Sequence, residues 1–157
     1  MIRRFDEFLR NGTVKKQVQN KARARSLIKE SNEKKEFLET ALKTIAPEKI
    51  YSNFIVDSCY DIIIELIRAK MFLDGYNAEN SHEAEVSYLE ILGFSLFDIR
   101  FMDEIRYYRN GIKYYGTILP EEYARKVLNF LNAIYPKLRK LCEIKWYINI
   151  KQPPLKI

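Results

Sequence analysis

The 157-residue chain contains little glycine and proline, with five residues of each. Because sandwiches and barrels need many tight turns, this scarcity argues against an all-β fold and favours long helices. The chain also lacks a run of about 18 apolar residues, which a transmembrane helix would need, and its first residues, MIRRFD, are not typical of a secretory signal. We therefore expect an all-α, cytoplasmic protein that does not interact with membranes.

Residue types that commonly bind metals or carry catalysis are also scarce, since the chain has only two cysteines and one histidine. Cys59 and Cys142 fall within helical patterns, which predicts reduced, buried thiols rather than a disulfide framework. No glycine-rich phosphate loop, HExxH, CxxC pair or serine-centred elbow is present. The sequence thus predicts no metal site and no cofactor.

Charge is plentiful and unevenly distributed, although the net charge is only +6. Residues 1–35 carry 11 basic and 4 acidic side chains, residues 48–104 carry 4 and 12, and residues 105–157 carry 11 and 3. Basic ends around an acidic middle suit either self-association through opposite patches or an anionic partner. The charge pattern alone leaves both interpretations open.

The apolar periodicity predicts two N-terminal helices that form a basic hairpin, residues 1–46, packed on a larger bundle. The first helix covers residues 2–10 and ends at Asn11-Gly12, and Thr13 caps a second helix that continues to about Ala46. Lys and Arg crowd the first half of the second helix. We interpret them as a solvated face, with phosphate binding as the alternative.

The apolar periodicity of residues 47–145 predicts an antiparallel bundle of four to five helices. The first runs from about Glu48 to Asp74 and ends at Gly75, and the second begins with an Asn80/Glu83 capping box. The third begins at Leu96 after the N-cap pair Ser95 and Asp98. The last follows Leu119-Pro120, and Pro136 should kink or divide it. Residues 146–157 alternate apolar and polar side chains before two prolines, which predicts an extended C-terminal arm.

The helix that begins at Leu96 carries the main functional prediction. Apolar residues recur in it at steps of four and three and predict one buried stripe, which consists of Phe101, Ile105, Tyr108, Ile112 and Tyr115. The opposite side is cationic and should face solvent or a partner, and consists of Met102, Arg106, Arg109 and Lys113. Asn110-Gly111 is a turn-forming pair inside this helix. We expect a bend there, which would bring Arg109 and Tyr114 into one cleft.

The run Arg109-Asn110-x-x-x-Tyr114, at the end of an amphipathic helix and followed by Gly116, resembles the signature of the HEPN (higher eukaryotes and prokaryotes nucleotide-binding) family. In that signature an Arg and a polar residue precede a His, whose place Tyr114 takes here. The stretches Tyr60–Lys70 and Asn80–Glu83 also fit the family's helical pattern. The resemblance covers roughly residues 48–145.

The resemblance implies a homodimer in which two signature helices form one composite cleft. Many members of the family are metal-independent ribonucleases, and some pair with a nucleotidyltransferase in toxin–antitoxin systems. Carried over to this chain, Arg109 would clamp a phosphate, Asn110 would position it and Tyr114 would stand in the catalytic place of the His. Arg106, Lys113 and Tyr115 would extend the nucleic-acid surface. Because a phenol is a weak base near neutral pH, Tyr114 favours binding over cleavage.

Three hypotheses follow. The first is a HEPN-like dimer that binds RNA or a nucleotide phosphate at Arg109 with little or no catalysis. The second is a metal-independent endoribonuclease of toxin type that uses Arg109 and Tyr114. The third is a non-catalytic interaction module in which Arg106 and Arg109 are structural, held by an acidic row.

The acidic row consists of Asp57, Asp61 and Glu65. We interpret it as an ion-pairing face, with metal binding as one alternative and the orientation of Arg109 by Asp61 or Glu65 as another. An Arg109 guanidinium satisfied by carboxylates of its own chain would favour the third hypothesis. His82, at the start of a helix far from Arg109 in the sequence, is expected to be structural or exposed.

Overall fold

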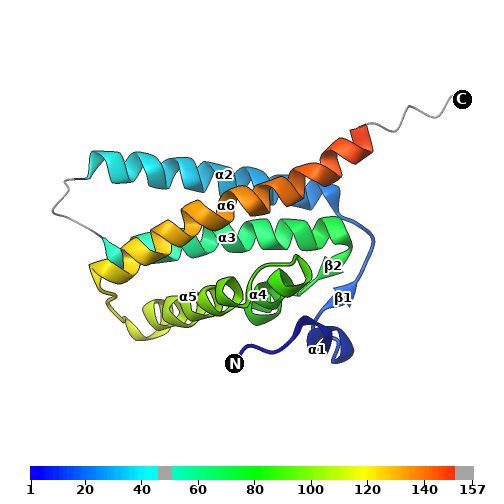
Figure 1. The fold of residues 1–157 in the computed structure, drawn as a ribbon, viewed down its shortest axis with the longest axis horizontal. Coiled ribbons are helices and arrows are strands. Elements are labelled where there is room, and N and C mark those ends of the chain that lie inside the picture. Colours follow the sequence, from blue (N-terminus) through cyan, green and yellow to red (C-terminus); the bar gives the residue numbers. More distant parts are fainter. Residues whose placement is uncertain (46–50, 151–157) are drawn as a thin grey trace, which may run out of the picture.

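The computed structural model describes residues 1–45 and 51–150, with the backbone alone for residues 144–150. It is 77% helical, which confirms the all-α class. Its described helices are α1 (Phe5–Arg10), α2 (Lys21–Thr44), α3 (Ser52–Asp74), α4 (His82–Ile91), α5 (Leu96–Tyr115) and α6 (Glu121–Ile150) (Figure 1). None of these helices is long and apolar enough to cross a membrane.

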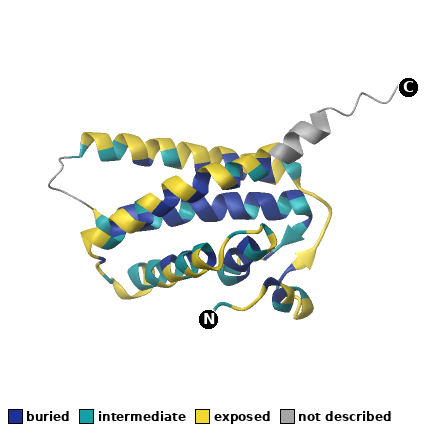
Figure 2. Ribbon diagram, in the orientation of Figure 1, coloured by how far each residue is buried: buried dark blue, intermediate teal, exposed yellow. Residues whose placement is uncertain are grey.

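Helix α3 is the centre of the fold. Of its 23 residues, 14 are buried, and Figure 2 shows burial concentrated along it, whereas the outer side of α2 is exposed. Helices α2 and α6 make most of the packing with α3, and α4 and α5 cover its other side. The buried apolar residues form one core that includes Phe5 of α1 and Cys142 of α6. Cys59 and Cys142 are free and buried, as predicted.

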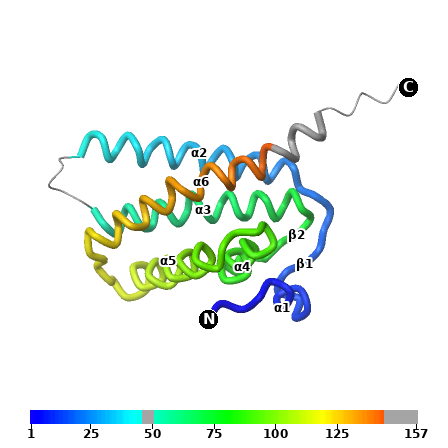
Figure 3. Tube along the Cα trace, viewed as in Figure 1, coloured from blue at the N-terminus to red at the C-terminus, as the bar shows by residue number. Residues whose placement is uncertain are grey.

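The second predicted helix is confirmed for Lys21–Thr44, but the segment before it, residues 13–20, is not helical, so the helix start at Thr13 and the hairpin are wrong. Asn20, not Thr13, caps α2 by accepting a hydrogen bond from the Arg23 amide at 3.0 Å. Strand β1 (Lys15–Lys16) pairs antiparallel with β2 (Tyr76–Asn77), and α1 packs against α4 rather than α2. Figure 3 shows this segment passing the end of α3. Pairing with a distant strand outweighed the local helical pattern.

Gly75 explains how the β1–β2 pairing and the end of α3 fit together. Its φ of 81° is left-handed, and a Cβ at this position would lie 2.7 Å from the carbonyl oxygen of Gln17. The Gln17 amide donates to the Gly75 carbonyl oxygen at 2.9 Å. Only glycine therefore allows the backbones to approach this closely.

Two further boundaries differ from the prediction. Ser81 is the N-cap of α4, because its hydroxyl accepts from the Ala84 amide, whereas Asn80 adopts a left-handed φ of 71°. Helix α6 continues through Pro136 without being divided and reaches Ile150. The extended arm is therefore wrong for residues 146–150, because extending a formed helix needs no new nucleation. Residues 151–157 lie outside the described residues.

Candidate functional site

Arg109 lies between two carboxylates of α3. Its Nε donates to Oδ1 of Asp57 at 3.2 Å, and its Nη2 donates to Oδ1 of Asp61 at 3.3 Å. The Arg109 side chain is only 19% exposed. Asp61 therefore orients Arg109, as the sequence suggested, and Asp57 shares that role. Glu65 does not, because its Oε1 accepts from Lys34 of α2.

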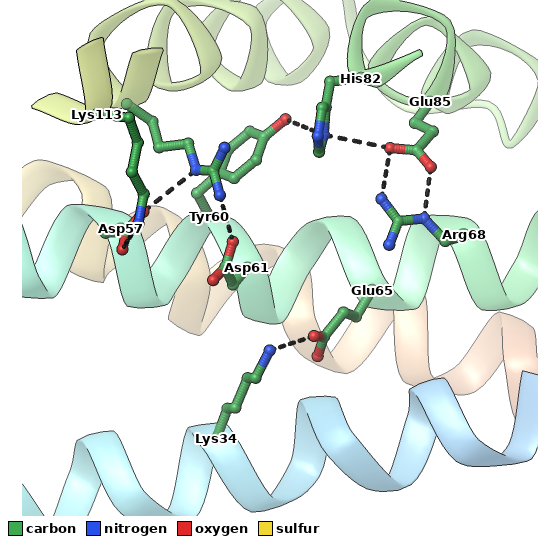
Figure 4. Close-up of polar contacts among 10 residues, drawn as sticks. Lys34, Asp57, Tyr60, Asp61, Glu65, Arg68, His82, Glu85 and Lys113 are labelled. Atoms are coloured by element: carbon green, nitrogen blue, oxygen red, sulfur yellow. Dashed lines mark hydrogen bonds and ion pairs between the residues drawn. The ribbon is translucent and has the colours of Figure 1, made fainter. Parts of the chain in front are cut away.

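Lys113 completes this cluster one turn further along α5. Its Nζ donates to Oδ2 of Asp57 at 2.9 Å, and its side chain is 44% exposed. Two cations on α5 thus meet two carboxylates on α3, and the formal charges cancel. Figure 4 shows Asp57 facing Lys113, with Asp61 one turn further along α3. This side of α5 was expected to face solvent or a partner, and instead it faces α3, with Met102 fully buried.

Tyr60 connects Arg109 to the only histidine. The Arg109 guanidinium carbon lies 5.2 Å from the centre of the Tyr60 ring, and the Tyr60 hydroxyl lies 3.1 Å from Nδ1 of His82 (Figure 4). His82, although far from Arg109 in the sequence, is therefore linked to it through Tyr60. No local pattern signals this contact, because it joins two helices across 22 residues of chain.

The same nitrogen of His82 also lies close to an ion-paired carboxylate. Its Nδ1 lies 3.4 Å from Oε2 of Glu85, and Glu85 accepts two hydrogen bonds from Arg68 at 2.5 and 3.0 Å. Burial lowers the pKa of His82, and Glu85 opposes that shift. Burial also raises the pKa of Tyr60. Both groups are therefore neutral near pH 7, and the network joins α3, α4 and α5.

Arg106 has a different partner from the one expected. Its Nε donates to Oδ1 of Asp103 at 2.8 Å, three residues earlier on the same helix, and its side chain is 23% exposed. The acidic row of α3 therefore does not hold Arg106. Its interaction is local to α5 and leaves little of the guanidinium on the surface.

The structure does not bring Tyr114 to Arg109. Helix α5 continues through Asn110 and Gly111, so residues five apart point about 140° away from each other. The Tyr114 side chain is instead 77% exposed. Asn110 instead lines a small cavity of about 370 Å³. The predicted bend and shared cleft are both absent from this part of the chain.

Gly111 has a role other than bending. A Cβ there would lie 3.1 Å from the Thr117 hydroxyl oxygen, and the amides of Gly116 and Thr117 both donate to the Gly111 carbonyl oxygen. The absence of a side chain lets the following loop fold back on α5. Gly111 therefore allows the tight turn that ends α5.

The outer face of α5 is aromatic, which the sequence reasoning missed. Large apolar side chains there are more than half exposed, and these are Leu96, Phe97, Tyr107, Tyr114 and Tyr115. Tyr115 was expected in the buried stripe and is instead 85% exposed. Tyr107 and Tyr114 lie seven residues apart, which is two helical turns, and this spacing was the available signal.

The comparisons with known proteins add no relative. No family model matches the chain, and no curated protein or solved structure matches it either. The HEPN resemblance therefore remains a prediction from the residues quoted above.

Proposed function

We propose that this protein is a non-catalytic interaction module that self-associates through the outer face of α5. The observation that carries this proposal is the row of exposed aromatic side chains on that face. Monomeric proteins rarely expose large contiguous apolar patches, and Tyr and Phe are enriched in protein interfaces. A second copy of the same face would cover these rings.

The state of Arg109 supports a non-catalytic role. To clamp a phosphate, its guanidinium would have to leave Asp57 and Asp61, or accept a third anion beside them. The first route is unfavourable because it leaves a half-buried carboxylate without its partner. The second is unfavourable because the third anion would be repelled by the two carboxylates. Tyr114, which takes the place of the signature His, lies away from this cluster.

The outer face is also self-complementary in charge. Arg100 and Glu104 are both exposed, one turn apart, with Phe97 three residues before and Tyr107 three residues after them. An antiparallel pairing of two α5 helices, centred between Arg100 and Glu104, would place Arg100 opposite Glu104 of a second copy. The same register would place Phe97 opposite Tyr107 of that copy. Such an isologous contact closes as a dimer.

Sedimentation velocity over a range of protein concentrations tests this proposal. We expect wild type to dimerise and Tyr107→Glu to be monomeric. Arg100→Glu should weaken the dimer, and adding Glu104→Arg to it should restore the dimer, because the charges are again opposite. Phe37→Ser, which changes an exposed ring on α2, serves as the control and should leave the dimer intact. A wild type that stays monomeric at every concentration would refute the proposal.

RNA or nucleotide-phosphate binding at the C-terminal end of α5 is the second candidate. The observation that favours it is an exposed cation beside two exposed rings, Lys113 followed by Tyr114 and Tyr115. Cations supply sequence-independent affinity for phosphates, and rings stack on bases. Salt-sensitive RNA binding lost in Lys113→Ala/Tyr114→Ala would favour this candidate. Cleavage in EDTA that Arg109→Ala abolishes would instead favour a ribonuclease.

A further inference from the structure

A groove between α2 and α3 forms a second surface, separate from the outer face of α5. Its cavity measures about 410 Å³ and lies between the middle of α2 and the first half of α3. Phe37 of α2 and Phe54 of α3 line it, and they are 66% and 40% exposed. Two phenylalanine rings on neighbouring helices thus flank one hollow without belonging to the core.

The groove is acidic as well as apolar. Its lining contains four carboxylates, those of Glu30, Glu33, Asp57 and Asp61, and a single ammonium group, that of Lys34. Lys34 is already bound to Glu65 beneath the groove. Arg109 and Lys113 pair with Asp57 and Asp61 from the α5 side. Because Glu33 has only a loose pair with Lys29, at 3.8 Å, the α2 wall keeps most of its negative charge.

The shape fits a third helix. Two packed helices leave a groove between them in which the ridges of another helix can pack. Amphipathic helices commonly bind in this way, with apolar residues at steps of three and four facing the groove. The apolar side of such a helix would cover Phe37 and Phe54, and basic side chains on its flank would reach Glu30 and Glu33.

We propose that this groove binds a cationic amphipathic helical segment of a partner protein. Charge complementarity selects a basic partner over an acidic one. It also argues against a second copy of the α5 face, since that face carries one positive and one negative side chain, Arg100 and Glu104. The two exposed rings provide the apolar contact.

The test uses a fluorescein-labelled 14-residue helical peptide, with leucines at steps of three and four and lysines on the flanks. Its binding to the full chain is measured by fluorescence anisotropy at 50 and 300 mM NaCl. We expect measurable binding that weakens at the higher salt concentration. Phe37→Ser and Glu30→Gln/Glu33→Gln should each weaken binding at least tenfold. All three positions are exposed, so the variants should fold, which circular dichroism checks.

Matched controls come from the rest of the surface. Phe97→Ser removes an equally exposed ring from α5, and Glu121→Gln/Glu122→Gln removes the same charge from the start of α6. Both should bind the peptide like wild type. A peptide with glutamate in place of lysine should not bind.

Several results would overturn the proposal. These are no binding of the basic peptide at millimolar protein, equal binding of the glutamate peptide, unchanged affinity in Phe37→Ser, or loss of affinity only in Phe97→Ser. Because Phe37→Ser should remain dimeric by sedimentation, failure of the groove proposal and failure of the dimer proposal are separate outcomes.

Discussion

Replacing Arg109 with Met tests whether this side chain holds α5 on α3. The substitution keeps an apolar stem and removes the charge from between Asp57 and Asp61, whose side chains are 26% and 33% exposed. Fully buried pairs that lose one partner cost about 3–5 kcal/mol, whereas exposed pairs are worth about 0–1 kcal/mol. Asp57 keeps Lys113 as a partner. We therefore expect a loss of about 2 kcal/mol in the free energy of unfolding.

Urea denaturation followed by circular dichroism at pH 7 measures this loss. For a chain of this length about 2 kcal/mol corresponds to a melting temperature lower by about 6 °C. Arg125→Met is the control, because Arg125 and its partner Glu121 are 61% and 54% exposed. It should change stability by less than about 0.5 kcal/mol.

The same variant separates the structural role of Arg109 from an anion-binding role. If Arg109→Met melts like wild type but loses affinity for RNA, Arg109 does not hold α5 on α3 and our reasoning is refuted. If the variant is destabilised by the expected amount and its RNA affinity does not change, the Arg109 guanidinium stabilises the fold and does not bind RNA. Asp61→Asn, combined with Arg109→Met, should cost less than the sum of the two single changes.

Three other changes follow from the structure. Burial lowers the pKa of His82, so as pH falls the unfolded chain takes up the His82 proton before the folded chain does. The stability that neutral His82 contributes is therefore complete above pH 6.5 and decreases below it. Urea denaturation at pH 7 and at pH 5 should show a smaller decrease in the free energy of unfolding for His82→Gln than for wild type. Burial raises the pKa of Glu65 above 4.5, and its Oε2 is buried without a partner among the described residues. Glu65→Gln should therefore raise stability at pH 7 by about 0.5–1 kcal/mol, and the difference should shrink as pH falls toward 4.5 and be lost below it. Gly75→Ala should lower the free energy of unfolding in urea by more than about 2 kcal/mol, because the strain of a left-handed φ adds to the clash with Gln17. The control is Gly93→Ala, which has a φ of 79° but no atom near its Cβ and should lose only about 1 kcal/mol.

The sequence predicted those features that depend on local chemistry. The Ser95–Asp98 capping box is present, with Asp98 donating its amide to the Ser95 hydroxyl at 3.1 Å. Gly75 ends α3, and the apolar character of α3 placed it at the centre of the bundle. Each of these follows from residues within one or two helical turns. Residues 13–20 could not be predicted in this way, because strand pairing with residues 76–77 decides their conformation.

The cationic side of α5 was predicted wrongly for a physical reason. Arg and Lys are usually exposed and aromatic side chains usually buried, so the cationic stripe seemed to face outward. The acidic row of α3 reverses this preference, since Asp57 and Asp61 are spaced one turn apart, as are Arg109 and Lys113. The matching spacing of the two charged rows was the signal in the sequence. It would have placed the cations against α3. The predicted apolar stripe is confirmed for Phe101, Ile105, Tyr108 and Ile112, which lie in or against the core, and wrong for Tyr115.

The ion pairs and the apolar contacts of α5 select the same rotation of the helix. Met102 and Ile105 are fully buried against the rest of the bundle, and turning α5 by one residue would move each of them by about 100°. Arg109→Met leaves both in place, so the aromatic outer face should keep its orientation and the proposed dimer should still form. A folded Arg109→Met protein that no longer dimerises would mean that the paired charges themselves belong to the interface, as in a composite cleft.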